Sequence, residues 1–406
     1  MSLRRMTGLA LALSMAIVPY TLWPVGASAS GGTLFAITGP GQSVLSRVDP
    51  VNGTITPLTA DLGGPNQGQL GTITGDPATH RIFAVRTTVS FDNNGNFLVT
   101  NEVLTIDSQT GQVLTVSPDI GKPVSQIAFD SISGVLYLMS FNAVYRLNPT
   151  TGATALVANL GDLGPTIMSM VVLPGGNTML INSESAGFGN SDQILSVNTQ
   201  NGTVTTGPQL TQLVRIVAYD ANAGALVGAS ECCPRQLLRI DPVTGAETPV
   251  AAFSNSNDQG LQFAMAVDPS SNTVFMDLQT FTGFTSTESQ IVTVNDQSGA
   301  TGVSPLINDI VWSEYFEPVV MTAESIKSDV RQALASGGIT QAGVAESLLA
   351  KLNAASAARS RGQCSTASAN YRAFLNDVKA QTGKDISAGT ANTLSIDAQY
   401  LMAHCP

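Results

Sequence analysis

One short phrase recurs six times in the chain and constrains its fold more than any other feature. Each copy contains an alternating apolar strand, an Asp or Asn, a Gly four residues later, and a second strand. The copies are centred on Asp49/Gly53, Asp107/Gly111, Asn148/Gly152, Asn198/Gly202, Asp241/Gly245 and Asn295/Gly299. An Asp or Asn side chain can accept hydrogen bonds from backbone N–H groups two residues ahead, and Gly adopts a positive φ without strain. The phrase therefore predicts six tight β-hairpins, and we interpret these acids and amides as turn residues rather than calcium ligands.

A second pair of apolar strands lies between consecutive hairpins. Examples are Leu70–Asp76 with Arg81–Val85, Gln126–Asp130 with Val135–Leu138, Arg215–Asp220 with Ala225–Gly228, and Phe263–Asp268 with Thr273–Met276. The whole period is roughly 49 residues and contains four strands, which is the size of one β-propeller blade. Only 12% of the residues are charged, which also fits many short strands joined by turns.

The two ends of the repeated region predict a closed ring rather than a solenoid or a row of sandwiches. Thr33–Thr38 lacks a first strand before it, and Asn308–Ser313 reads as a lone first strand with nothing after it. Joining them completes a sixth blade and removes exposed sheet edges. We therefore expect a mainly β fold, with a six-bladed β-propeller over residues 30–317 that is closed by the N-terminal strand.

These hairpins resemble those of bacterial secreted six-bladed propellers of the NHL and TolB-like groups. The resemblance covers residues 33–317 and rests on the Asp-Pro-x-Thr-Gly form of the turn, as in Asp241–Gly245. It implies the fold and not one activity, because such propellers include lyases, lactonases, dehydrogenases and binding modules.

After a linker at 318–321, the apolar period changes from that of strands to that of helices. Four apolar stripes predict a small all-α four-helix domain over residues 322–406. Thr322, Thr340 and Ser365 are expected to cap the first three helices. The ending of the chain resembles the FIMAH-type helical module of bacterial extracellular proteins, with Tyr-Leu at 400–401 in place of the usual Phe-Ile. This resemblance implies an accessory domain and not a catalyst.

The N-terminal residues 1–29 have the pattern of a secretory signal peptide. Arg4 and Arg5 precede an apolar run from Leu9 to Val18, and Ala-Ser-Ala at 27–29 supplies small residues at a cleavage position. A retained membrane anchor is the alternative, which the shortness of the run disfavours. No other stretch is long and apolar enough to span a bilayer. We therefore expect a secreted or periplasmic protein.

The four Cys residues can form two disulfides in such an oxidising compartment. Cys364 and Cys405 fall at the start of the third helix and the end of the fourth, which lie together in an antiparallel helical hairpin, so we expect a Cys364–Cys405 disulfide. The adjacent Cys232 and Cys233 then remain to form a vicinal disulfide. Two interpretations of that bridge stay open, a rigid apolar plate against a ligand or a device that only stiffens its loop.

The long connections of the expected propeller fall on one face, and we place any binding site there. They are Phe91–Phe97, Ser183–Asp192, Glu231–Arg235, Thr280–Glu288, Asp61–Gln69 and Ser254–Gly260. The candidate ligand-binding residues on this face are Cys232, Cys233, Asp92, Asn94, Glu184, Phe188, Asp258 and Phe284. Asp92 and Asn94 offer alternating oxygen ligands for calcium, but the early Gly95 departs from the EF-hand pattern and favours a hairpin tip.

No catalytic constellation emerges from the sequence. The only two His residues, His80 and His404, are too few for a His-based catalyst or metal site, and no metal ligand set is predicted. A net charge of −11 disfavours nucleic acid as a partner. We expect a binding or interaction propeller with a protein or glycan ligand and no cofactor, with bound calcium as the alternative. The alternative is a carboxylate- or calcium-dependent lyase or hydrolase acting on an extracellular polymer or small molecule.

Overall fold

The structure is a computed structural model of the 406-residue chain. It describes residues 32–403 apart from 40, 65–67, 92–93, 132, 162–165, 174–176, 185–191, 222, 231–234, 253–258, 283–284 and 319–321. The chain divides into two compact units between Glu317 and Pro318. Each unit is described by itself below.

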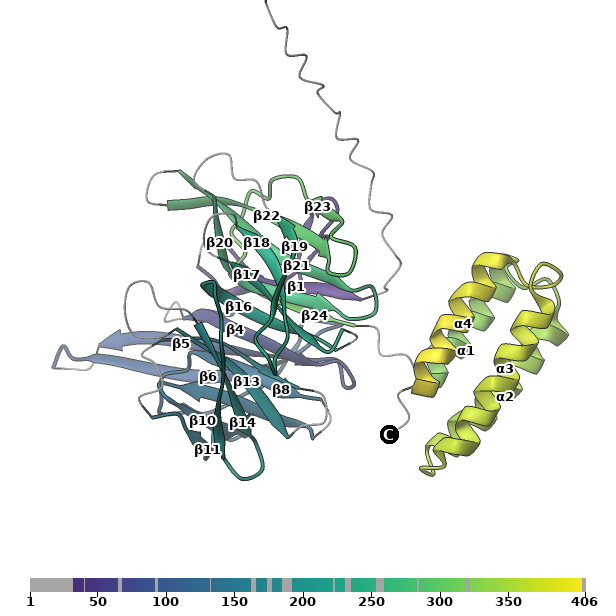
Figure 1. Ribbon diagram of the computed structural model, residues 1–406, viewed down its shortest axis with the longest axis horizontal. Helices are drawn as coiled ribbons and strands as arrows, with labels where there is room; N and C mark the ends of the chain where they lie inside the picture. The colour runs from purple at the N-terminus through teal and green to yellow at the C-terminus, as the bar shows by residue number, and fades with distance from the viewer. Residues whose placement is uncertain are drawn as a thin grey trace, which may run out of the picture. The chain divides into compact units, whose positions relative to one another are not determined.

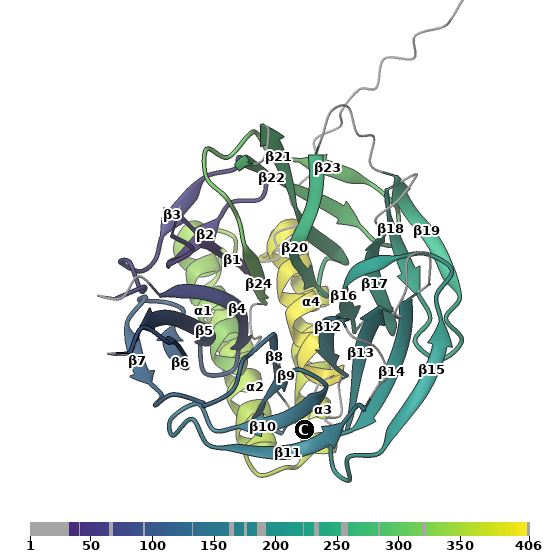
Figure 2. The same cartoon turned by 90° about the vertical axis from the view of Figure 1, so that its left-hand side faces the viewer.

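The first unit is a six-bladed β-propeller in which every blade is a four-stranded antiparallel sheet (Figures 1 and 2). Blade 1 contains β24 (Ser313–Glu317), β1 (Thr33–Thr38), β2 (Val44–Val48) and β3 (Ile55–Pro57). Blade 2 contains β4 (Gln69–Asp76), β5 (Arg81–Phe91), β6 (Phe97–Asp107) and β7 (Val113–Val116). Blade 3 contains β8 (Gln126–Asp130), β9 (Val135–Ser140), β10 (Ala143–Leu147) and β11 (Thr154–Asn159). Blade 4 contains β12 (Thr166–Val172), β13 (Thr178–Glu184), β14 (Asp192–Asn198) and β15 (Val204–Gln209). Blade 5 contains β16 (Val214–Asp220), β17 (Ala225–Ser230), β18 (Gln236–Ile240) and β19 (Glu247–Ala252). Blade 6 contains β20 (Gln259–Asp268), β21 (Thr273–Thr282), β22 (Thr285–Asn295) and β23 (Thr301–Val303).

Apolar side chains fill each of the six interfaces between neighbouring blades. Six buried clusters each draw residues from two adjacent blades, so the core is a ring of interfaces rather than one centre. Alternation along a strand explains how one strand serves two interfaces. In β1, Leu34 and Ala36 pack toward blade 6, whereas Phe35 and Ile37 pack toward blade 2.

The predicted hairpin chemistry is confirmed in all six copies. In each, the Asp or Asn Oδ1 accepts hydrogen bonds from the backbone N–H groups two and three residues ahead. The Gly N–H donates to the carbonyl of that Asp or Asn, and its φ lies between 67° and 75°. These six residues are therefore turn formers in the structure, as the sequence predicts.

The ring closes as predicted, but its closing strand begins later in the chain. β24 pairs with β1 from Ser313↔Ile37 to Thr33↔Glu317, whereas the sequence placed the strand at Asn308–Ser313. Residues 308–312 are instead a loop, which hydrogen bonds tie to side chains of neighbouring strands. Val311 donates to Ser289 Oγ (3.0 Å) and accepts from Gln279 Nε2 (2.9 Å).

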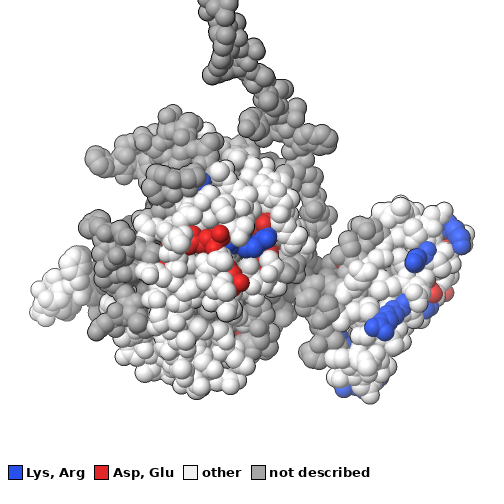
Figure 3. Space-filling model, viewed as in Figure 1, with Lys and Arg blue, Asp and Glu red and all other residues white. Residues whose placement is uncertain are grey.

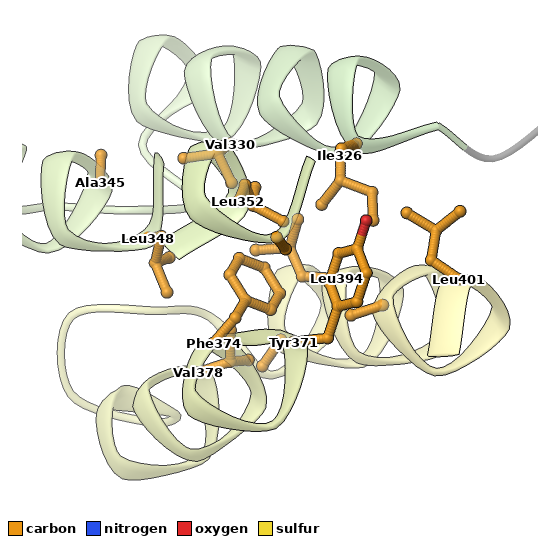
Figure 4. Packing of buried hydrophobic residues seen from close by; sticks show 14 of the residues in the cluster. Ile326, Val330, Ala345, Leu348, Leu352, Tyr371, Phe374, Val378, Leu394 and Leu401 are labelled. Carbon is orange, nitrogen blue, oxygen red and sulfur yellow. The ribbon is translucent and has the colours of Figure 1, made fainter. Parts of the chain in front are cut away.

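The second unit is a helical domain built from α1 (Ala323–Ser336), α2 (Ala342–Arg359), α3 (Cys364–Gln381) and α4 (Ala388–Ala403). Its core brings together apolar side chains from all four helices (Figure 4). Leu348, Leu352 and Phe374 are fully buried in this core. None of the described helices has the length and apolarity needed to cross a bilayer.

One of the three predicted helix caps is confirmed, and two are wrong. Thr322 caps α1, because its Oγ1 accepts from Ser325 N–H at 3.0 Å. The residue before α2 is Gln341, and Thr340 Oγ1 instead bonds Asp385 Oδ1 at 3.2 Å. α3 already begins at Cys364, so Ser365 lies inside the helix. A partner distant in sequence thus overrides the local capping signal of Thr340.

Candidate functional site

The first strands of the six blades surround a central channel (Figure 2). A cavity of about 310 Å³ lies among them. Its wall includes the polar residues Thr72, Gln126, Ser169, Ser313 and Glu314. Ser169 lies on β12 among Ile, Met and Val residues, and Thr72 lies on β4 between Gly71 and Ile73.

Two carboxyl groups lie in the interface between blades 6 and 1. Glu314 on β24 shares its strand face with Phe316, whose ring stacks on Phe275 of β21 at 5.2 Å. Asp277 follows Phe275 by two residues on β21 and therefore points into the same interface. Asp277 is 0% exposed and Glu314 is 6% exposed. We call Asp277 and Glu314 the acid pair.

No cation compensates the acid pair in the described part of the chain. All four carboxylate oxygens are buried there, and no hydrogen bond of ordinary length and angle reaches them. Burial raises the pKa of Asp277 to about 7, and the neighbouring Gln279 and Ser289 offset part of this rise. Burial also raises the pKa of Glu314 well above its usual range, and the nearby Asp277 raises it further. Unpaired buried carboxylates are costly, so this position is chemically unusual.

A second buried charged group differs because it contains a cation. Arg239 Nη2 on β18 lies 3.4 Å from Asp296 Oδ2, and it also donates to the Asp296 carbonyl oxygen. Burial raises the pKa of Asp296 to about 6, the neighbouring Asp220 raises it further, and Arg239 lowers it. Since Arg239 neutralises one charge and bridges two blades, we interpret this group as structural.

The β5–β6 hairpin extends beyond the rest of blade 2 (Figure 1). We call residues 87–101 the arm. Val89 pairs with Val99 and Phe91 with Phe97, so these four side chains share one face. The Phe91 and Phe97 rings lie 4.7 Å apart, and their side chains are 65% and 74% exposed. The arm therefore presents an apolar face to solvent.

Most of the predicted site residues lie outside the described residues. These are Asp92, Phe188, Cys232, Cys233, Asp258 and Phe284. Asn94 is described and exposed at the arm tip. Glu184 ends β13 opposite Asp192, but the position of its side chain is not described. Whether these candidates form one site therefore lies outside what the described residues test.

The other predictions from the sequence have mixed outcomes. Cys364 begins α3, but Cys405 and His404 lie outside the described residues, so the Cys364–Cys405 bridge stays a prediction, as does Cys232–Cys233. His80 ends the turn after β4, where its Nδ1 lies 2.6 Å from Glu317 Oε1. Within the described ranges, no group of three or more His, Cys, Asp or Glu side chains could hold a metal ion.

One predicted loop is largely a hairpin. The connection expected at Thr280–Glu288 contains the ends of two long strands, since β21 continues to Thr282 and β22 starts at Thr285. Its Thr and Phe residues favour extended pairing. Asp277 and Glu314 were missed by sequence reasoning. The available signal was a single acid within an apolar strand, as in Val-Phe-Met-Asp-Leu at 274–278.

Comparisons with known proteins support this two-unit description. The FIMAH domain model matches residues 323–403. No curated protein sequence matches the chain. A chain of the nidogen–laminin complex covers 71% of this chain and 98% of itself, with 9% identity and a TM-score of 0.51.

Two bacterial structures are also similar. TolB from Acinetobacter baumannii matches 70% of this chain and 67% of its own, with 14% identity and a TM-score of 0.45. A Bacteroides fragilis protein provisionally described as a 6-phosphogluconolactonase matches 70% and 97%, with 10% identity and a TM-score of 0.44. At such identities the likeness concerns the fold alone. The chain therefore combines a six-bladed β-propeller with a C-terminal FIMAH domain.

Proposed function

We propose that this protein is a secreted or periplasmic interaction propeller that binds an extended segment of a protein partner along the arm. The observation that carries the proposal is the exposed apolar face formed by Val89, Phe91, Phe97 and Val99. Contiguous exposed apolar surface on a soluble domain marks an interaction site more often than scattered apolar residues do.

The backbone of the arm supports a partner that is itself a strand. β5 pairs with β4 only as far as Thr87, and β6 pairs with β7 only as far as Leu104. Among the described strands, none pairs with the outer edges of residues 88–91 and 97–100. These edges offer backbone donors and acceptors beside an apolar face, which is the arrangement used when a peptide adds a strand to a sheet.

Charge favours a protein partner over a glycan or a lipid surface. The described residues of the arm contain no charged side chain, and the side of the arm visible in Figure 3 is uncharged. Arg86, at its base, is held by Glu102 at 2.6 Å and by the Leu62 carbonyl at 2.9 Å. Anionic lipid headgroups attract free basic residues, and glycans require polar groups beside an aromatic ring, whereas apolar pockets require neither.

The test compares the wild-type chain with a Phe91→Ser/Phe97→Ser double variant and a Val243→Ser control. Val243 is 82% exposed on another hairpin, so its substitution removes apolar surface away from the arm. Proteins that co-purify from producing cells with the wild type and the control are then purified and titrated by biolayer interferometry. We expect saturable binding that the double variant loses while its melting temperature is unchanged. Retained binding by the double variant, or binding to a glycan array alone, would contradict the proposal.

A second function, a carboxylate- or calcium-dependent lyase or hydrolase, is supported by one observation. The acid pair contains Glu314, which lines the central channel, and the raised pKa of Asp277 resembles that of a general acid. Assays of polysaccharide and lactone cleavage with Asp277→Asn test it. Activity that survives this substitution would remove the acid pair from the mechanism.

A further inference from the structure

We propose that Asp277 and Glu314 bind a divalent cation of the calcium type at the blade 6–blade 1 interface, beside the central channel. The inference is independent of partner binding by the arm, which lies on blade 2.

The first step is the absence of a cation and of a well-formed hydrogen bond at these groups. Both side chains are more than nine-tenths buried, and no hydrogen bond of ordinary length and angle reaches their four oxygens from the described residues. The comparable buried acid Asp268 is satisfied by the Ser270 and Ser271 hydroxyls. A protein rarely leaves four buried acceptors without a donor or a cation, so the pair points to a ligand that is not part of the chain.

The second step is the negative charge of the acid pair. The ionised pair carries two negative charges, and the groups that shift the Glu314 pKa include Asp277 but no cation. By contrast, Asp296 has Arg239 at 3.4 Å. One divalent cation neutralises the ionised pair, whereas a monovalent cation leaves half of its charge buried and uncompensated.

The third step is the chemistry of the two acids, whose ligand atoms are all oxygens. Ser289 and Gln279 lie beside Asp277, as their effect on its pKa indicates, and neither a thiol nor an imidazole is among these neighbours. Hard cations take carboxylate, amide and water oxygens, and calcium accepts six to eight of them in flexible geometry. Glu314 is also one of the residues that line the channel cavity. Calcium fits this set better than zinc, which prefers nitrogen and sulfur.

Binding of one cation by both acids would also stabilise the closed propeller. Asp277 belongs to the last blade and Glu314 to the strand that closes the first, so a shared cation joins the two ends of the propeller. A ligand that binds only the folded state raises its stability, so the melting temperature reports the site directly.

The experiment uses the chain from residue 30 onward, stripped with EDTA and held at pH 8 to favour the ionised form of the acids. The melting temperature is measured during titration with CaCl₂ and, separately, MgCl₂. Calorimetry supplies the stoichiometry. We expect an upward shift of several degrees with calcium, one site per chain, and loss of both signals in Asp277→Asn and Glu314→Gln. Asp397→Asn, which alters a buried acid of the helical domain, is the matched control and should keep the full shift.

The folding of the variants is checked independently. In EDTA, Asp277→Asn and Glu314→Gln should be at least as stable as the wild type, because they remove uncompensated buried charge. Terbium provides a local probe, since Trp312 precedes Glu314 by two residues and the only other Trp, Trp23, lies within the expected signal peptide. Sensitised terbium luminescence that calcium displaces would support the site. No shift with any divalent cation, or a shift that both variants retain, would overturn it and leave a pair that only shares protons.

Discussion

Phe316 of β24 stacks on Phe275 of β21, with ring centroids 5.2 Å apart and ring planes 19° apart. The first residue comes from the last strand of the propeller in sequence and the second from the preceding blade, and both are buried. Because β24 also pairs with β1, this contact lies where the two chain ends of the ring meet. The stacked pair and the β1–β24 ladder together close the propeller.

Truncating Phe316 to Ala should therefore weaken the closure. We expect a loss of about 3–5 kcal/mol in the free energy of unfolding, since the substitution removes a buried ring and leaves a cavity. Urea denaturation followed by circular dichroism near 215 nm measures it. Val51→Ala, at an exposed hairpin position, should change the stability by less than about 0.5 kcal/mol. Equal effects of the two substitutions would show that the interface does not depend on the stacked pair.

The Gly of each repeated hairpin has a second role besides its positive φ. A Cβ at Gly111 would lie 2.1 Å from the Leu58 carbonyl oxygen of the preceding blade, and one at Gly202 would lie 2.1 Å from the Val157 carbonyl oxygen. The other four hairpin Gly residues also abut the preceding blade or the segment that follows it, at 2.5–3.0 Å. The spacing of the repeat thus encodes the approach of neighbouring blades as well as a turn.

Gly111→Ala and Gly95→Ala separate these two roles. Both residues have positive φ, +75° and +81°, but nothing lies within 4 Å of a Cβ at Gly95. Gly95→Ala should cost about 1–2 kcal/mol, the conformational penalty alone. Gly111→Ala should cost this penalty plus the clash, about 3 kcal/mol or more. The difference between the unfolding free energies of the two variants measures the cost of placing a Cβ against the preceding blade. A difference of zero would show that contact with that blade does not require glycine at Gly111.

The propeller could be predicted because its turns depend on residues that are close together in the sequence. The features that were missed depend on contacts between residues that are far apart in the sequence. The six turns are visible in the sequence because Asp or Asn and Gly act within five residues. The start of β24 was misplaced because Ser289 and Gln279, on other strands, capture Val311 and keep it out of the ladder. The acid pair escaped prediction for the same reason. Asp277 is the one acid of β21 and Glu314 shares β24 with Glu317, so no pattern in either strand links Asp277 to Glu314, and only closure of the ring brings them to one interface.

The pKa of Asp277, raised to about 7 from 3.8, gives stability a definite pH dependence. Between these two values the folded state holds a proton that the unfolded state has released, so the free energy of unfolding falls as pH rises from about 4 to about 7, and then levels off. Asp277→Asn should remove this part of the slope, on the order of 4 kcal/mol.

Denaturation in EDTA from pH 4 to pH 8 checks this dependence. The hairpin acids Asp107 and Asp241 do not interfere, because their lowered pKa values mean that their contribution is lost only as pH falls below about 4. The pKa of Asp296 is raised to about 6, so Asp296 also lowers the free energy of unfolding as pH rises. This contribution is present in both proteins and cancels when they are compared. Parallel curves for the wild type and Asp277→Asn would show that the Asp277 pKa is ordinary.

Arginines on the third strands of alternate blades link each to the next blade. Arg146 Nη2 donates to the Thr199 carbonyl at 2.8 Å, and Arg47 Nη2 donates to the Gln109 carbonyl at 2.6 Å. Arg239 makes the equivalent bond to the Asp296 carbonyl. The corresponding residues of the intervening blades are Thr105, Ser196 and Thr293. The arginine hydrogen bonds therefore link the six blades as three pairs.

Arg146→Met keeps the apolar stem of the side chain and removes the charged donor, so it isolates this bond between blades. We expect a loss of about 1.5–3 kcal/mol, the range for a hydrogen bond to a charged group, since the Thr199 carbonyl would lose its donor. Arg81→Met, at an exposed position of blade 2, is the control and should change stability by less than about 0.5 kcal/mol. Urea denaturation of both variants at pH 7 and moderate salt makes the comparison. If Arg146→Met unfolds at the wild-type urea concentration, the pairing of blades contributes nothing to the stability of the ring.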